Sequence, residues 1–180
     1  MRIIAGTHRS RKLVTLEGMA TRPMTDRMKE SIFNTIGPFF DGGIVLDLFG
    51  GSGALTLEAI SRGASEAYIT DNSIDAIKVI TENVKSLKED NKVHIMKLDY
   101  VQALNKLKTI QFDLIFLDPP YRMNIANEIV DFILEHQMIK PDGIIICQYV
   151  RGNMKPIESL SLRKNFSYGN SEVSIYEMGS

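Results

Sequence analysis

The sequence Asp118-Pro119-Pro120-Tyr121 limits the possible folds of this chain more than any other stretch. It follows an apolar run, 112–117, that is typical of a buried parallel strand. Two consecutive prolines cannot continue a sheet ladder, because neither has a backbone N–H, so the strand must end at Asp118. The motif therefore places a carboxylate, rigid carbonyl groups and an aromatic ring at the carboxyl end of a strand. In open α/β sheets this edge is where ligands bind.

Strand-like and helix-like patterns alternate along most of the chain. The apolar runs predict strands at 44–48, 67–70, 92–98, 112–117 and 144–150. Helical spacing predicts helices at 28–36, capped by Thr25 or Asp26, and at 54–62, 74–87 and 124–136. Residues 140–143 are expected to form a turn, and 160–168 with 173–178 an antiparallel ribbon. The fold class is therefore α/β: a doubly wound, mostly parallel Rossmann-like sheet with an antiparallel C-terminal hairpin at its edge.

The N-terminal region is more basic than the rest of the chain. Residues 1–30 carry seven Lys or Arg and three acidic residues, although the net charge of all 180 residues is −1. We expect one domain over 1–180, in which 1–20 form a basic β-hairpin appendage with few apolar residues to bury. Its tip, Arg9, Arg11 and Lys12, would contact a polyanion, with a solvated basic arm as the alternative. The following helix is expected to expose Arg27, Lys29 and Glu30.

Several classes of protein are excluded by what the sequence lacks. The single cysteine, Cys147, lies in an apolar run and is expected to be a buried core thiol, so neither a disulfide framework nor a multi-cysteine zinc site is possible. The three histidines have no ligand spacing, and we expect no metal. No apolar run is long enough to span a membrane, and the N-terminus lacks the apolar core of a signal peptide. We therefore expect a cytoplasmic protein, and a monomer.

A glycine-rich turn follows the first predicted strand. Residues 47–53, Asp-Leu-Phe-Gly-Gly-Ser-Gly, lie between that strand and a helix, and we call them the glycine turn. Glycines there let a ligand approach the main chain. The spacing is neither that of the three-glycine dinucleotide fingerprint nor that of a phosphate-binding loop. The turn indicates a nucleotide-type site, with a plain tight turn as the alternative.

Two further acids end predicted strands. Asp71 lies about 20 residues beyond the glycine turn, where an acid can accept hydrogen bonds from ribose hydroxyls. The alternative is that Asp71 or Ser73 caps the next helix. Asp99 follows the third strand and could accept from an adenine amino group or cap a helix, and both interpretations remain open.

Four features, taken together, are the motif 118–121, the glycine turn, Asp71 and Asp99. Their order and spacing resemble those of the S-adenosylmethionine-dependent methyltransferases that modify exocyclic amino nitrogens. Within that group, the sequences at 2–6, 11–13, 22–27, 29–30 and 33–34, with the tail at 168–169 and 173–176, are similar to the bacterial family that methylates the N2 amino group of one guanine in 16S ribosomal RNA. The resemblance covers nearly the whole chain. It implies a class I methyltransferase fold with about seven strands, the last antiparallel.

The resemblance also implies site residues and a cofactor, S-adenosylmethionine. Asp47 and the glycines Gly50, Gly51 and Gly53 would face its methionine part, Asp71 its ribose and Asp99 its adenine. Phe49, Asn72 and Tyr100 complete the implied cofactor contacts.

The target base would be held by the diproline motif. The guanine amino nitrogen is a poor nucleophile, because its lone pair is delocalised into the ring. We expect the Asp118 side chain and the Pro119 carbonyl to accept its N–H bonds while Tyr121 stacks on the base. The alternatives are a carboxylate that caps the turn and a tyrosine that packs under the next helix.

The implied partner is 16S ribosomal RNA in a small-subunit assembly particle. Phosphate contacts are expected from Arg9, Arg11, Lys12, Arg22, Arg27 and Arg122, although Arg22 and Arg27 could instead meet the cofactor carboxylate or a nearby acid. An adenine-N6 DNA methyltransferase would use the same motif but usually needs a further target-recognition region. A nicotinamide-dependent oxidoreductase would need the missing three-glycine spacing, and a non-catalytic RNA-binding protein would be expected to lose Asp118 or the glycines.

Overall fold

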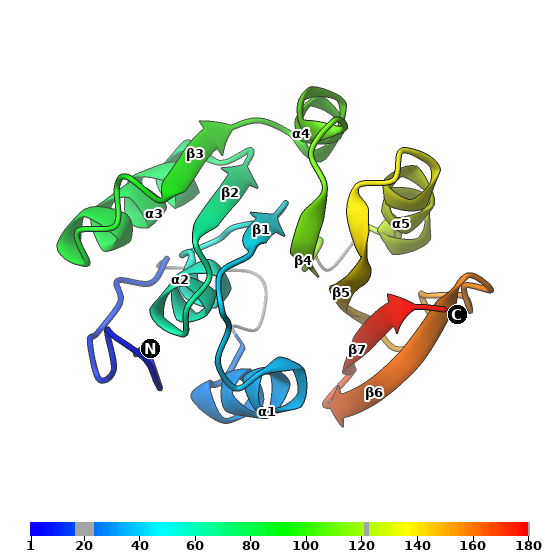
Figure 1. The fold of residues 1–180 in the computed structure, drawn as a ribbon, viewed down its shortest axis with the longest axis horizontal. Helices are drawn as coiled ribbons and strands as arrows, with labels where there is room; N and C mark the ends of the chain where they lie inside the picture. The colour runs from blue at the N-terminus through cyan, green and yellow to red at the C-terminus, as the bar shows by residue number, and fades with distance from the viewer. Residues whose placement is uncertain (17–23, 121–122, 180) are drawn as a thin grey trace.

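A seven-stranded sheet forms the centre of the protein. The computed structural model describes residues 1–16, 24–120 and 123–179. The strand order is β3-β2-β1-β4-β5-β7-β6 (Figure 1). The strands are β1 (Ile44–Asp47), β2 (Glu66–Asp71), β3 (Val93–Lys97), β4 (Phe112–Leu117), β5 (Ile139–Val150), β6 (Leu160–Tyr168) and β7 (Ser171–Met178). β1 to β5 pair in parallel, and β7 pairs antiparallel with both β5 and β6. The predicted doubly wound sheet with an antiparallel edge is confirmed.

Five described helices cover the two faces of this sheet. They are α1 (Asp26–Ile36), α2 (Ala54–Ser61), α3 (Ile74–Ser86), α4 (Tyr100–Leu107) and α5 (Ala126–Glu135). In Figure 1, α1, α2 and α3 lie on one side of the sheet and α4 and α5 on the other. The core accordingly has two layers: Phe33 and Leu57 pack in one, Leu104 and Ile133 in the other. Cys147 is fully buried in the second layer, as predicted.

Local signals in the sequence set both ends of α1. Thr25 is the N-cap of α1, because its hydroxyl accepts the Met28 N–H at 3.1 Å, and Gly37 ends that helix.

The start of β5 differs from the prediction, since β5 begins at Ile139, which pairs with Phe112. The residues expected to form a turn, 140–143, lie inside β5 at an irregularity in the pairing with β4.

The predicted N-terminal hairpin is not seen. A single antiparallel bridge joins Arg2 to Lys12. Backbone hydrogen bonds also run from the Ile3 N–H to the Arg11 carbonyl and from the Leu13 N–H to the Met1 carbonyl, both at 2.9 Å. The N–H groups of Ile4 and Ala5 donate to the Glu58 carboxylate at 3.0 and 3.2 Å. The expectation that this segment buries little was also wrong, because Ile3 is fully buried and Leu13 is buried beside it in the α1 to α3 layer.

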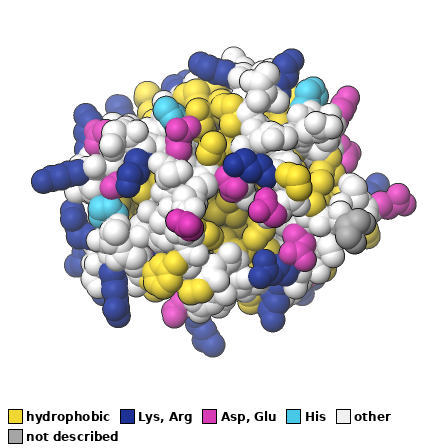
Figure 2. All heavy atoms as spheres, viewed as in Figure 1, with side chains coloured by type: hydrophobic (Ala, Val, Ile, Leu, Met, Phe, Trp, Pro, Cys, Tyr) yellow, Lys and Arg dark blue, Asp and Glu magenta, His cyan; other side chains and the backbone are white. Residues whose placement is uncertain are grey.

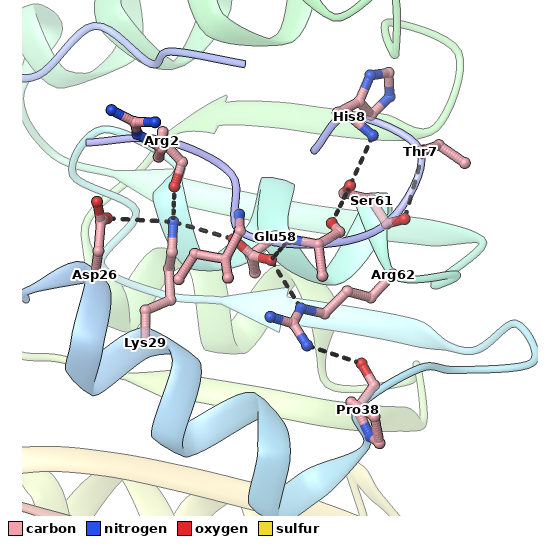
Figure 3. Close-up of polar contacts among 11 residues, drawn as sticks. Arg2, Thr7, His8, Asp26, Lys29, Pro38, Glu58, Ser61 and Arg62 are labelled. Atoms are coloured by element: carbon pink, nitrogen blue, oxygen red, sulfur yellow. Dashed lines mark hydrogen bonds and ion pairs between the residues drawn. The ribbon is translucent and has the colours of Figure 1, made fainter. Parts of the chain in front are cut away.

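The structure also corrects the predicted exposure of Lys29. It was expected on the exposed face of α1, yet its side chain is completely buried. Its Nζ lies 3.1 Å from Glu58 Oε1 and donates to the Arg2 carbonyl at 2.6 Å (Figure 3). Lys29 shares one helix face with Ile32, Phe33 and Ile36, which are buried as well. It is therefore unavailable to phosphates.

The described part of the chain shows neither a membrane helix nor a metal cluster. Within 1–16, 24–120 and 123–179, no helix is both long and apolar enough to cross a membrane. Over the same residues, no group of His, Cys, Asp and Glu side chains is arranged to hold a metal ion.

Candidate active site

Acidic side chains stand at the carboxyl ends of neighbouring strands. Asp47 ends β1, Asp71 ends β2, and Asp118 directly follows β4. Because β1 lies between β2 and β4 in the sheet, the three carboxyl groups occupy one edge. Asp99 follows β3 at the same edge and is the N-cap of α4. The structure thus brings together all four acids that the sequence analysis selected.

The glycine turn is held by backbone hydrogen bonds and by one of these acids. The Gly50 N–H donates to the Thr70 carbonyl at 2.9 Å, and the Gly51 N–H donates to Asp71 Oδ2 at 3.0 Å. A Cβ on Gly50 would lie 2.5 Å from Ile69 Cγ1, so the close packing there favours glycine. Gly51 has a φ of +60°, and a Cβ on it would meet nothing within 4 Å. That side of the turn is open to a ligand.

The sequence left open whether Asp71 or Ser73 caps α3 and whether Asp71 is instead free to meet a ribose. Ser73 is the N-cap of α3, with its hydroxyl 3.3 Å from the Ala76 nitrogen. Asp71 accepts the Ser73 N–H at 2.9 Å and the Gly51 N–H through its other oxygen. Asp71 therefore positions the glycine turn and does not cap α3. Asn72 lies exposed beside it.

Asp99 forms a capping box with Gln102. Its Oδ1 accepts the Gln102 N–H at 2.8 Å, and the Gln102 side chain accepts the Asp99 N–H at 3.1 Å. The capping interpretation is confirmed, while a contact to adenine remains a prediction. Tyr100, the next residue, lies near Phe49, with 6.0 Å between the ring centroids.

Two of the acids hold their protons more tightly than ordinary carboxyl groups. Burial raises the pKa of Asp47 to about 7, with a smaller contribution from the charge of Asp71, and the Thr56 hydroxyl opposes this through a 2.9 Å hydrogen bond. Burial also raises the pKa of Asp118 to about 7, and the charge of Asp47 adds to it. No positive charge among the described residues offsets either shift. The edge is therefore suited to a cationic ligand.

The Asp118 carboxyl group is available to a substrate. It receives no hydrogen bond from the residues that the structure describes, so a capping role in its own turn has no support. The Met123 N–H donates to the Pro120 carbonyl at 2.9 Å. Asp118 and Pro119 line a cavity together with Gln148 and Tyr149 of β5.

Gln148 is a candidate site residue that the sequence analysis missed. Gln148 is the last buried residue of β5. It lies next to Asp118, which follows β4. The signal available in the sequence was a single carboxamide in the otherwise apolar run 144–150.

Comparison with known proteins agrees with the resemblance that the sequence motifs indicated. A family model described as "Conserved hypothetical protein 95" matches residues 1–177. The chain belongs to this family. It is 39% identical over 181 residues to "Putative rRNA methyltransferase YlbH" of Bacillus subtilis, with 98% of each protein covered. It is 30% identical over 184 residues to "Ribosomal RNA small subunit methyltransferase D" of Haemophilus influenzae, covering 98% of this chain and 93% of that protein.

A solved structure gives the same result for the fold. "Putative methyltransferase yhhF" from Escherichia coli superposes with a TM-score of 0.88 at 28% identity, covering 99% of this chain and 97% of the other. The resemblance that the motifs indicated is therefore confirmed at the level of the family, a class I methyltransferase family that uses S-adenosylmethionine.

The described residues fit that cofactor. Gly51 leaves the main chain open to it, and Asp71 stands beside the turn as a ribose acceptor would. Asp47 and Asp118, with raised pKa values and no basic partner among the described residues, suit a molecule that carries a sulfonium and an ammonium group.

Three of the predicted RNA-binding residues lie on the N-terminal segment. The segment that carries Arg9, Arg11 and Lys12 is tied to the C-terminal ends of two helices: the Thr7 N–H donates to the Ser61 carbonyl, and Arg11 donates to the Ser86 carbonyl at 2.8 Å. The glycine turn precedes α2 and Asp71 precedes α3. Asn83 of α3 joins the N-terminal segment to the glycine turn, because its Nδ2 donates to the Val14 carbonyl at 2.9 Å and to the Ser52 carbonyl at 2.8 Å.

Other predicted contacts fall on different parts of the surface. Arg27 is exposed on α1. Tyr121, Arg22 and Arg122 lie outside the described residues. Lys and Arg side chains gather along the left margin of the face in Figure 2, the side on which Figure 1 places the N-terminal segment and α3.

Proposed function

We propose that this chain transfers a methyl group from S-adenosylmethionine to the exocyclic N2 amino group of a guanine in 16S ribosomal RNA. The observation that carries this proposal is the Asp118 carboxyl group, which has no hydrogen-bond donor among the described residues and lies with Pro119 in a cavity beside the acidic edge. The relatives named as ribosomal RNA methyltransferases support the substrate class.

Asp118 and Pro119 activate the amino group by accepting its two N–H bonds. These contacts orient the nitrogen lone pair out of conjugation with the ring. S-adenosylmethionine, when bound, supplies an electrophilic methyl group. As the nitrogen lone pair forms the new N–C bond, the bond between this methyl carbon and sulfur would break with its electron pair staying on sulfur, which leaves neutral S-adenosylhomocysteine. The nitrogen then loses a proton to Asp118 or to water. A pKa of about 7 suits Asp118 to take up and release a proton near neutral pH. Tyr121 would stack on the base.

The other acids and the glycine turn hold the cofactor. Asp47 faces its cationic end, Asp71 accepts from the ribose hydroxyls, and the second oxygen of Asp99 accepts from the adenine amino group. Asp99 can do so while it caps α4, because the cap uses Oδ1 alone. Phe49 and Tyr100 supply apolar surface beside the adenine, and Asn72 is exposed next to the ribose acid.

Phosphate contacts come from a separate surface. Arg9, Arg11 and Lys12 are exposed, and Arg27 is exposed on α1. These side chains bind the phosphates of a folded ribosomal RNA in an assembling small subunit. Arg22 and Arg122 are proposed as further phosphate contacts.

The test is transfer of labelled methyl to 16S ribosomal RNA, free and in partly assembled small subunits, followed by nucleoside analysis. N2-methylguanosine is the expected product. Asp118→Ala should abolish transfer and retain the affinity for S-adenosylhomocysteine, whereas Asp131→Ala, which removes an exposed acid of α5, should change neither. Methyl on adenine, or transfer to DNA alone, would replace the proposal by the adenine-N6 alternative, and unchanged turnover of Asp118→Ala would remove Asp118 from catalysis.

A further inference from the structure

Gln148 carries a buried polar atom that lacks a partner. Its side chain is 9% exposed, and its Oε1 has no hydrogen-bond partner in the described part of the chain. Gln148 lines the same cavity as Asp118 and Pro119. It follows Cys147, which pairs with Leu117, and Asp118 follows Leu117. Gln148, within β5, and Asp118, at the end of β4, therefore lie at the same level of two adjacent parallel strands.

Packing alone does not account for a carboxamide at this position. Its strand neighbour Ile146 and its cross-strand partner Val173 are buried apolar residues. A buried acceptor without a donor is destabilising, and such groups in folded proteins usually have a ligand, a water or a catalytic reason. An apolar side chain would avoid this cost. The unpaired oxygen beside the catalytic motif indicates a hydrogen-bond donor that arrives with the substrate.

The Watson–Crick edge of guanine offers the complementary groups. Next to the reacting N2 amino group, guanine carries N1–H, a donor, and then O6, an acceptor. A carboxamide presents one acceptor and one donor side by side and can bind both atoms. Adenine instead has N1, an acceptor, next to its amino group, followed by a C–H. A Gln148 oxygen beside the amino site therefore pairs with guanine and opposes the N1 lone pair of adenine.

We propose that Gln148 is a specificity-determining residue that selects guanine, with Oε1 accepting from N1–H and Nε2 donating to O6. This inference rests on the proposed function, since it assigns the neighbour of the amino group that Asp118 holds. A site built to pair with a substrate N–H discriminates strongly against an analogue that lacks it, because its own polar group is then left unpaired.

The test uses a target RNA that carries either guanine or 2-aminopurine at the methylated position. 2-Aminopurine keeps the 2-amino group, but its N1 is an acceptor and O6 is absent. A synthetic fragment ligated into the small-subunit RNA supplies both substrates, and kcat/KM is measured for the wild type and for Gln148→Met, Gln148→Leu and Gln148→Glu. Differences in the reactivity of the two amino groups cancel when the guanine to 2-aminopurine ratio is compared between proteins.

The wild type should prefer guanine, and Gln148→Met and Gln148→Leu should lower the ratio about tenfold or more through slower guanine turnover. Gln148→Glu keeps an acceptor for N1–H but places a second acceptor opposite O6, so it should lose part of the preference and retain more of it than the Met and Leu variants. Affinity for S-adenosylhomocysteine should not change in any variant, which shows that each one is folded. An unaltered ratio in a folded Met or Leu variant overturns the inference while guanine methylation by the wild type stands. A Gln148→Glu variant that prefers guanine as strongly as the wild type does overturns the contact between Nε2 and O6. If the wild type methylates neither base, the proposed function fails and the inference fails with it.

Discussion

Lys29 and Glu58 form an ion pair, 3.1 Å from Nζ to Oε1, in which neither side chain is exposed. Glu58 also pairs with Arg62 at 2.7 Å and accepts the backbone N–H groups of Ile4 and Ala5 (Figure 3). Burial alone would raise the pKa of Glu58, but the hydrogen bonds from Ile4 and Arg62, together with Lys29, lower it. One carboxylate therefore joins α1 and α2 to the segment that carries the basic tip.

Replacing Lys29 by Met should lower the free energy of unfolding by about 3–5 kcal/mol, because it leaves the charge of Glu58 buried with one of its two cationic partners and removes the donor to the Arg2 carbonyl. Urea unfolding measures the loss. Arg27→Met is the matched control on an exposed position of the same helix, and it should shift stability by less than about 0.5 kcal/mol. Equal effects of the two substitutions would show that the buried pair is not a major contribution.

Asp118 should make the folded state less stable as pH rises. Its pKa is raised from 3.8 to about 7, so the folded protein holds this proton more tightly than the unfolded chain does. Ionisation therefore opposes folding, and the loss of stability develops between about pH 4 and pH 7. Asp118→Asn should raise the free energy of unfolding relative to the wild type more at pH 8 than at pH 5, as measured by urea unfolding. A difference that does not depend on pH would contradict the raised pKa.

The same two carboxyl groups should make cofactor binding depend on pH. Asp47 and Asp118 are each only about half ionised near pH 7, and their negative charge favours a sulfonium over a neutral thioether. The affinity for S-adenosylmethionine should therefore rise between pH 6 and pH 8 relative to that for S-adenosylhomocysteine. Calorimetry on both ligands checks this, since the ammonium and carboxylate groups that they share cancel in the ratio. A constant ratio would show that neither acid senses the sulfonium charge.

The sequence predicted features that depend on neighbouring residues better than features that depend on contacts between residues far apart in the chain. Local rules sufficed for β4, whose bounds 112–117 were predicted correctly because two prolines end it, and for the Thr25 cap. Lys29 was placed wrongly because a lysine on a helix is usually exposed, although its spacing from Ile32, Phe33 and Ile36 put it on the buried face. Its partner, Glu58, is 29 positions away, and no local pattern connects the two residues.

The N-terminal hairpin was predicted wrongly and Gln148 was missed for a related reason, since both depend on contacts between residues far apart in the sequence. The hairpin prediction rested on local alternation of residue types, whereas the Glu58 carboxylate, more than 50 positions away, accepts the backbone N–H groups of Ile4 and Ala5. The sequence contains Gln148, but only the pairing of β4 with β5 places it beside Asp118. Acids at strand ends were predictable, because every parallel strand delivers its last residue to one edge.

Gly51→Ala should impair cofactor binding more than it impairs folding. The φ of +60° costs a residue with a Cβ about 1–2 kcal/mol, and the new methyl group would project into the open side of the glycine turn. Gly152→Ala is the matched control, since its φ is +88° and a Cβ there also meets nothing within 4 Å. Both variants should lose similar stability in urea, while only Gly51→Ala should lose affinity for S-adenosylhomocysteine. Equal affinities would mean that the cofactor does not approach Gly51.

Removing charge from the basic tip should weaken RNA binding in a salt-dependent way. Arg9 and Lys12 are both exposed, and each phosphate contact contributes roughly 0.7–0.9 to the slope of log affinity against log salt. Arg9→Ala with Lys12→Ala should therefore reduce that slope by up to about 2 and raise KM for the RNA substrate, while kcat stays unchanged, because neither side chain is assigned to the catalytic or cofactor site. The control, Lys106→Ala with Lys108→Ala, removes the same charge at the end of α4. If both double variants lower the slope equally, the effect comes from net charge and the tip is not a phosphate contact.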